Sequence, residues 1–113
     1  MNRKPVVYLA GPYSHPEPIA NMRDAIELAD RLFDCCAPLI PHLTGFWHLV
    51  SPRTYEEWLE LDCQYLEVCD ALLRFGGGSL GADKEVALAR ELGKRVFFTE
   101  GVLREWVATW TPE

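Results

Sequence analysis

Long apolar runs, an excess of positive charge and paired metal-ligand spacings are all absent from this sequence of 113 residues. Runs such as Ala71-Leu72-Leu73 are far shorter than the ~20 residues of a membrane span. No basic segment followed by an apolar run opens the chain, so we expect no secretory signal. The 11 basic and 17 acidic residues give a net charge of −6, which disfavours binding to a nucleic-acid polymer. We therefore expect a cytoplasmic protein that binds neither membranes nor nucleic acid.

The four cysteines, at positions 35, 36, 63 and 69, form no C-x-x-C pair. The three histidines do not stand at zinc-site spacing with them. We therefore expect reduced, buried thiols and no metal centre. A phosphate-binding loop of the nucleoside-triphosphatase type is also excluded, because no Gly-Lys-Ser/Thr follows the glycine-rich segment at 76–81.

Short apolar runs alternate with segments of helical periodicity along the whole chain. Apolar residues make up 49% of the sequence, enough for one core in a single domain over residues 1–113. The pattern predicts strands at 5–9, 37–40, 70–75 and 95–99. It predicts helices at 19–33, 55–68, 82–92 and 102–110, with a loop at 42–53. This order favours an α/β fold with a mainly parallel sheet and helices on both faces.

In such a fold, ligands bind beyond the carboxyl ends of the strands. The segments expected there are 10–14, 42–47, 76–81 and 99–100. One of them spells G-x-G-x-x-G at Gly76, Gly78 and Gly81, but 113 residues hardly accommodate the second half of a dinucleotide fold. What remains is a glycine turn that can approach an anion or a sugar closely.

Two carboxylates depart from the surrounding pattern. Asp62 has only apolar or aromatic neighbours three and four residues away, so it is either a site carboxylate with a raised pKa or a buried acid with an internal partner. Glu85 is expected in the first turn of its helix, where the helix dipole favours the ionised form. It is either a nucleophile or an ordinary acidic residue of a first turn. Together they resemble the acid pair of a glycosidase.

Aromatic residues are candidates for the rest of the site. Tyr8 is expected at the end of the first strand, with its hydroxyl toward the same edge of the sheet, unless it is an ordinary strand aromatic. His42, Phe46 and Trp47 can form a wall that stacks a flat heterocycle, or can pack against one another within their loop.

The ordered set of Tyr8, Asp62, Ser79, Gly81 and Glu85, with the Y-L-A-G-P opening, resembles the nucleoside 2-deoxyribosyltransferase superfamily. That superfamily includes 2′-deoxynucleoside 5′-phosphate N-hydrolases, and the similarity is greatest to its DUF4406 branch. The resemblance covers residues 6–98. It implies a flavodoxin-like (Rossmann-like) three-layer sandwich with a four- to five-stranded sheet. It also implies retaining glycosyl transfer without metal or organic cofactor, and a homodimer or larger assembly.

The resemblance also implies roles for individual residues. Glu85 matches the nucleophile, Asp62 the acid that assists at the sugar or base, and Tyr8 the tyrosine beside the nucleophile. The substrate-binding positions would be Gly11, Ser14, His42, Trp47, Gly78, Ser79 and Gly81.

The expected reaction is cleavage of the base–sugar bond of a nucleoside or nucleoside 5′-monophosphate through a glycosyl–Glu85 intermediate. Ser79, where the transferases carry aspartate, favours a 5′-monophosphate. Pro12 and Pro16 argue the other way, because they offer no N–H to a phosphate. Base exchange between nucleosides and a non-catalytic nucleotide-binding or sensor module remain as alternatives.

Overall fold

The computed structural model describes residues 3–112, which form one parallel sheet covered on both faces by helices. The strands are β1 (Val6–Ala10), β2 (Ala37–Leu39), β3 (Ala71–Arg74) and β4 (Arg95–Phe97). Their order is β2-β1-β3-β4, and every pairing among these strands is parallel. The predicted α/β sandwich is confirmed, with four strands in the described part of the chain.

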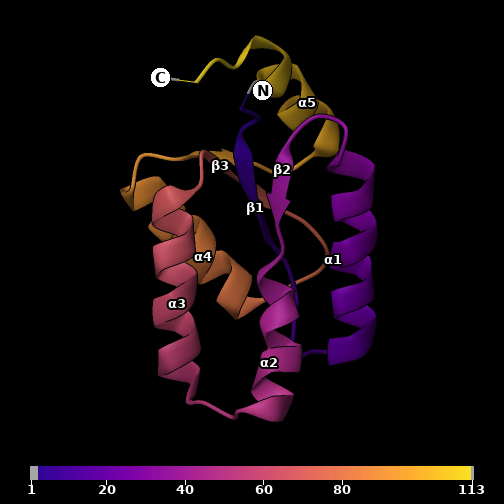
Figure 1. The fold of residues 1–113 in the computed structure, drawn as a ribbon, viewed down its shortest axis with the longest axis vertical. Helices are drawn as coiled ribbons and strands as arrows, with labels where there is room; N and C mark the ends of the chain where they lie inside the picture. The colour runs from indigo at the N-terminus through magenta and orange to yellow at the C-terminus, as the bar shows by residue number, and fades with distance from the viewer. Residues whose placement is uncertain (1–2, 113) are drawn as a thin grey trace.

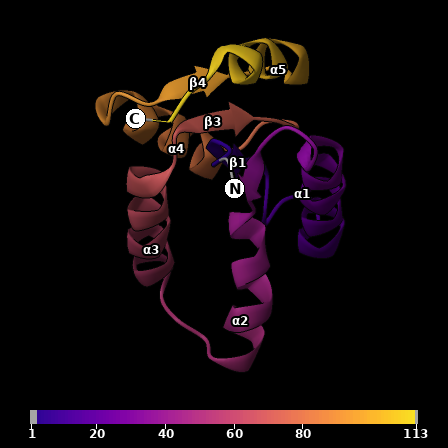
Figure 2. The same ribbon diagram turned by 45° about the horizontal axis from the view of Figure 1, so that its top comes forward.

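Two pairs of helices form the outer layers. Helices α1 (Pro18–Leu32) and α5 (Glu100–Thr109) pack on one face, and α3 (Tyr55–Val68) and α4 (Leu80–Glu91) pack on the other. Figures 1 and 2 show α1 and α3 on opposite sides of the strands. Because β1 continues into α1 and β3 into α4, the connections leave these neighbouring strands toward opposite faces. A crevice at such a point is where open parallel sheets bind ligands.

The central strand β1 divides its side chains between the two cores. Val7 and Leu9 pack with α1 and α5, whereas Tyr8 and Ala10 pack with α3 and α4. All four are fully buried, as expected for a strand with helices on both faces. The sequence pattern predicts Tyr8 at the end of this strand, and that is wrong, because β1 runs on to Ala10 and Tyr8 lies in its middle. Its side chain therefore passes under α4 instead of reaching the sheet edge.

The predicted loop at 42–53 is wrong over most of its length. It contains the end of a short 3₁₀ helix, η1 (Pro41–Leu43), and the helix α2 (Thr44–Val50). No side chain caps α2, and a glycine interrupts it, so local signals for a helix are weak. Tertiary packing determines this helix instead. Gly45 lies so close to Tyr13 that a Cβ there would be 2.3 Å from the tyrosine hydroxyl.

Helix caps correct two further boundaries. Ser79 Oγ accepts a hydrogen bond from the Ala82 amide at 3.1 Å, so α4 begins at Leu80 and Glu85 falls in the second turn, not the first. Thr99 caps α5 in the same way, so this helix begins at Glu100 and not at residue 102 as predicted. Thr54 caps α3, which begins at Tyr55 as predicted.

The expectation of free, buried thiols is confirmed in part. The four cysteines are free, with Cys36 and Cys69 buried and the other two partly buried. Within residues 3–112, no helix has the length and hydropathy needed to cross a bilayer.

Candidate active site

Tyr8 and Glu85 meet between β1 and α4. The Tyr8 side chain is fully buried, and its hydroxyl donates a hydrogen bond to Glu85 Oε2. The strand directs Tyr8 into the α3–α4 layer, and the second turn of α4 directs Glu85 back toward the sheet. The hydrogen bond therefore holds Glu85 at a position set by the most buried strand of the fold.

The pKa of Glu85 is raised to about 7. Burial is the main cause, and the charge of Asp62 adds to it, whereas the Tyr8 hydrogen bond and the charge of Arg74 act in the opposite direction. Burial, followed by the charge of Glu85, also raises the pKa of Tyr8 far above its ordinary value, so this hydroxyl stays protonated and remains a donor. The group at position 85 is thus a carboxyl that ionises near neutral pH.

Asp62 on α3 is the second acid at this place. It is partly buried, and its Oδ1 is buried without a hydrogen-bond partner among the described residues. Burial raises its pKa to about 7. The sequence pattern allows either a site carboxylate or a buried acid with an internal partner. This oxygen has no internal partner among the described residues. Since an unsatisfied buried polar atom costs ~1–3 kcal/mol, this atom is available to a ligand that hydrogen-bonds to it.

The glycine-rich turn lies where β3 passes into α4. Gly76 has a φ of +75°, which favours glycine, whereas a Cβ at Gly77 or Gly78 would meet open space. Gly78 and Gly81 are exposed, and Ser79 is partly buried at the helix start. The three positions expected to bind substrate therefore border α4, the helix that carries Glu85.

Gly11 and His42 support the loop after β1. His42 is 4% exposed, and its Nε2 donates to the carbonyls of Gly11 and Pro12, at 3.2 and 2.9 Å. Burial lowers its pKa, so the ring is neutral, and its Nδ1 is buried without a partner in the described part of the chain. Gly11 lies under the Phe75 ring, where a Cβ would approach within 2.5 Å. Ser14 is exposed on the same loop.

Trp47 lies in a different environment. Its ring packs edge-on against Trp58 at 5.1 Å between centroids, with the Arg53 guanidinium 6.0 Å above it. These residues line a shallow hollow of about 280 Å³ whose lining includes neither of the two acids. Because His42 is buried under the β1 loop, the structure does not bring His42 and Trp47 into one stacking wall.

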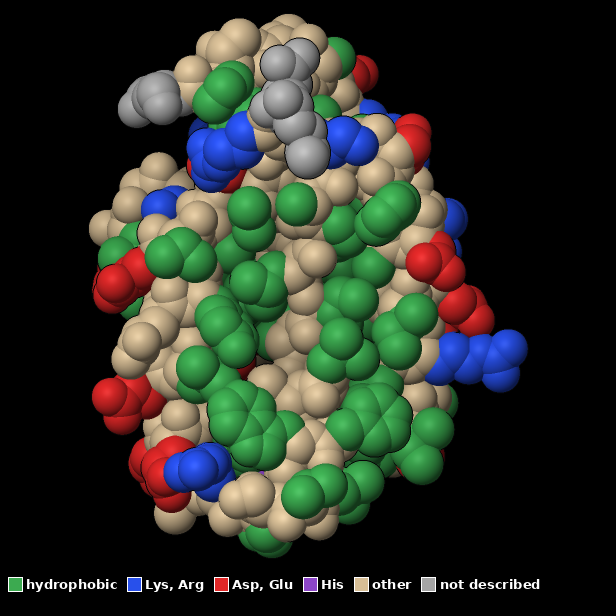
Figure 3. Space-filling view, in the orientation of Figure 1, with side chains coloured by type: hydrophobic (Ala, Val, Ile, Leu, Met, Phe, Trp, Pro, Cys, Tyr) green, Lys and Arg blue, Asp and Glu red, His purple; other side chains and the backbone are tan. Residues whose placement is uncertain are grey.

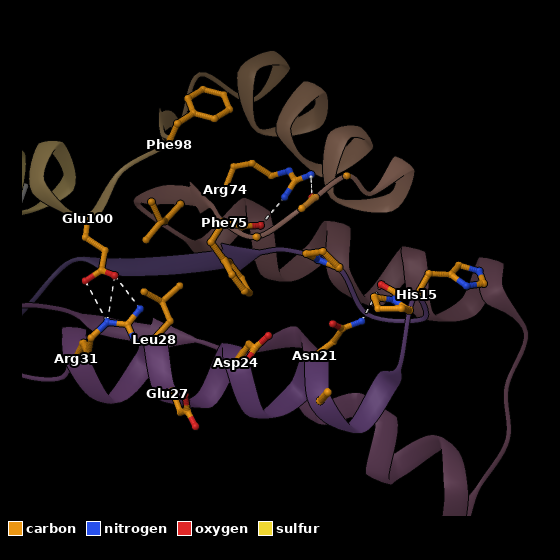
Figure 4. A pocket seen from close by; sticks show the side chains of 17 residues that line it. His15, Asn21, Asp24, Glu27, Leu28, Arg31, Arg74, Phe75, Phe98 and Glu100 are labelled. Carbon is orange, nitrogen blue, oxygen red and sulfur yellow. Dashed lines mark hydrogen bonds and ion pairs between the residues drawn. The ribbon is translucent and has the colours of Figure 1, made fainter.

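A larger cavity, of about 750 Å³, lies on the α1 side of the sheet. Figure 4 shows Asp24 of α1 opposite Phe75, with the Arg31–Glu100 ion pair at one end and Arg74 beside the glycine turn. Its lining includes Gly78 but not Tyr8, Asp62 or Glu85. The acid pair therefore lies outside this cavity.

Arg74 is the residue near the site that sequence reasoning missed. It occupies the end of an otherwise apolar strand, and its charge acts on Glu85. A lone arginine in the run D-A-L-L-R-F is the signal that could have identified it. No protein-family model and no curated protein matches the chain.

Proposed function

We propose that the protein is an N-glycosidase that cleaves the base–sugar bond of a nucleoside or a nucleoside 5′-monophosphate. One observation supports the proposal, namely the cluster of buried Tyr8 with the partly buried acids Glu85 and Asp62, on the face of the parallel sheet that α3 and α4 cover. The resemblance to the nucleoside 2-deoxyribosyltransferase superfamily supports the same roles for these three residues.

The reaction proceeds in two steps. The Glu85 carboxylate attacks C1′, the C1′–N bond breaks, and the departing base takes the bonding electron pair and a proton from Asp62. Water then attacks C1′, Asp62 takes up the water proton, and Glu85 leaves as a carboxylate. The sugar is released with its original configuration, and both acids return to their starting states.

This chemistry requires an ionised Glu85 and a protonated Asp62. The Tyr8 hydroxyl and the Arg74 charge both stabilise the Glu85 carboxylate. For Asp62, burial acts against the charged form. Burial also raises the pKa of Glu85, and both carboxyls titrate at about 7, so we assign the single shared proton to Asp62, the acid without such stabilising partners.

The 5′ substituent distinguishes the candidate substrates. Ser79 Oγ accepts the Ala82 amide as a helix cap, and its hydroxyl hydrogen can still donate to a phosphate. Ser14 is exposed on the loop after β1 and can act from the other side. Base exchange is the alternative reaction, with a second base in place of water. A nucleotide-binding or sensor module would bind the same ligands without turnover.

We also propose a homodimer or larger assembly in the cytoplasm. Figure 3 shows apolar side chains gathered over the face that α2 and α3 present, and Phe46, Leu49 and Val50 of α2 are exposed. We place no interface on Trp106 or Trp110, because Trp106 packs against Phe97 within the chain and Trp110 lies beneath Arg3. Four free thiols are typical of a reducing compartment.

The test is incubation with a panel of nucleosides and 5′-monophosphates, followed by chromatography for free base. Adding a second base to the same reactions separates exchange from hydrolysis.

Glu85→Gln is expected to lower turnover on the order of 10⁴-fold. Glu91→Gln, an exposed change on the same helix, serves as the matched control and is expected to retain wild-type turnover. Absence of cleavage by wild type, or equal cleavage by Glu85→Gln, would refute the proposal. Thermal stabilisation by a nucleotide without product would favour the binding module.

A further inference from the structure

We infer that Asn21 is a positioning residue of this site, which together with His42 holds the loop at 11–16 by its carbonyl groups and so sets the preference for a 5′-phosphorylated substrate. This role rests on the proposed function, because Ser14 of the same loop is a proposed contact to the 5′ substituent. Asn21 acts through the loop and not by touching the substrate.

Asn21 is a buried polar residue on an otherwise apolar helix face. It lies near the start of α1, and only 8% of its surface is exposed. The other buried residues of this helix are apolar, namely Met22, Ala25, Leu28, Ala29 and Leu32. An asparagine inside a helix is disfavoured, and burying its amide is costly unless the amide is hydrogen-bonded. Contacts outside the helix must therefore account for this residue.

The side-chain amide of Asn21 makes two such contacts. Its Nδ2 donates to the carbonyls of Tyr13 and His15, at 2.9 Å each. Figure 4 shows Asn21 directed from α1 toward His15. Because both partners are acceptors, the position requires a group with two N–H donors, which neither a carboxylate nor an apolar side chain of the same size can supply.

His42 holds the preceding part of the same loop from the short helix η1. Its Nε2 donates to the carbonyls of Gly11 and Pro12, at 3.2 and 2.9 Å. Two buried side chains thus bind four of the six carbonyls at 11–16. The backbone of the loop is therefore fixed through its acceptor groups.

Holding these carbonyls determines where the amides of the loop point. The peptide units Pro12–Tyr13 and Tyr13–Ser14 are trans, so each N–H points opposite to the preceding carbonyl. His42 binds the Pro12 carbonyl, so the Tyr13 N–H points away from His42. Asn21 binds the Tyr13 carbonyl, so the Ser14 N–H points away from Asn21. Neither amide donates to another group within residues 3–112, so both are open to an acceptor such as a phosphate.

The experiment compares Asn21→Leu, Asn21→Ser and the control Asp30→Asn with wild type. Leucine has nearly the size of asparagine and no donor, and serine keeps one hydroxyl donor. Asp30 is exposed on the same helix, so its variant is expected to behave as wild type. The order parameter of the Ser14 amide is measured by ¹⁵N relaxation, which does not depend on turnover. KM and kcat are measured for a 5′-monophosphate and for the corresponding nucleoside, and circular dichroism checks each fold.

In Asn21→Leu, the order parameter of the Ser14 amide is expected to fall from about 0.85 to below about 0.6. KM for the 5′-monophosphate is expected to rise ~10-fold, because the loop loses two hydrogen bonds. KM for the nucleoside and both kcat values should stay within ~2-fold, whereas general damage to the fold would lower kcat for both substrates alike. Asn21→Ser should lie between Asn21→Leu and wild type in both measurements.

A folded Asn21→Leu protein with a wild-type order parameter at Ser14 would overturn the inference, whether or not wild type cleaves nucleosides. A lowered order parameter with an inactive wild type supports the hold of Asn21 on the loop and refutes the proposed function alone. In an active enzyme, an equal rise of KM for both substrates overturns the link to the 5′ substituent. If Asn21→Leu does not fold, Asn21→Ser decides by the same two measurements.

Discussion

Replacing Asp62 with asparagine is expected to stabilise the protein in a strongly pH-dependent way. Burial raises the pKa of Asp62 from 3.8 to about 7, so the native state holds this proton more tightly than the unfolded chain. As the pH rises through 4, the unfolded state ionises first and gains stability relative to the native state. The loss continues until the native carboxyl also ionises near pH 7 and is constant above it.

The magnitude follows from the two pKa values. A rise from 3.8 to about 7 corresponds to at most ~4 kcal/mol. Because Asp62 is only partly buried, solvent screening reduces this to ~2 kcal/mol. Asparagine has nearly the same shape and does not ionise. The variant is therefore expected to match wild type near pH 4 and to exceed it by ~2 kcal/mol at pH 8.

Urea unfolding at each pH unit from 4 to 8 measures this difference. Glu67→Gln is the matched control, because Glu67 is exposed on the same helix, and its difference from wild type should stay within ~0.5 kcal/mol at every pH. The reasoning is refuted if the Asp62→Asn difference is independent of pH, or if wild type is the more stable protein at pH 8.

Three further outcomes are expected. The pH profile of kcat/KM should be a narrow bell centred near pH 7, because the ionised nucleophile and the protonated acid both titrate at about 7. Tyr8→Phe removes the donor to Glu85, so the acidic limb of that profile should move to higher pH. Gly11→Ala should destabilise the fold by ~1–3 kcal/mol in urea unfolding, because its Cβ would meet the Phe75 ring at 2.5 Å, whereas Gly78→Ala meets open space and should be nearly neutral.

Local chemistry explains which parts of the fold could be predicted. Helix α3 has the predicted bounds because Thr54 and Glu57 form a capping box within four residues of chain. Its periodicity also identified Asp62 as an acid on an apolar face. Helix α2 could not be predicted from its sequence, because Gly45 disfavours a helix locally. The reason for a glycine at this position is its close contact with Tyr13, which only the folded structure shows.

The candidate site also has parts that could be predicted from the sequence and parts that could not. Tyr8, Asp62 and Glu85 could be selected from their residue types and from their places in the pattern. Their ionisation could not be predicted, because the pattern predicts a Glu85 held ionised by a helix dipole, whereas the structure places it partly buried in the second turn, where the charge of Asp62 acts on it. The aromatic wall of His42 and Trp47 could not be judged either, because the burial of His42 depends on the carbonyls of the β1 loop.

By itself, the sequence determined the α/β class and the alternation of elements, and it indicated which acids are candidates, because apolar periodicity and helix caps act over a few residues. Only the tertiary structure decided that a tyrosine from β1, an acid from α3 and an arginine from β3 act on one carboxyl of α4. These groups are far apart along the chain. Their pKa values depend on burial and on charges in the neighbouring layer, which exist only once the sheet and its helices have packed.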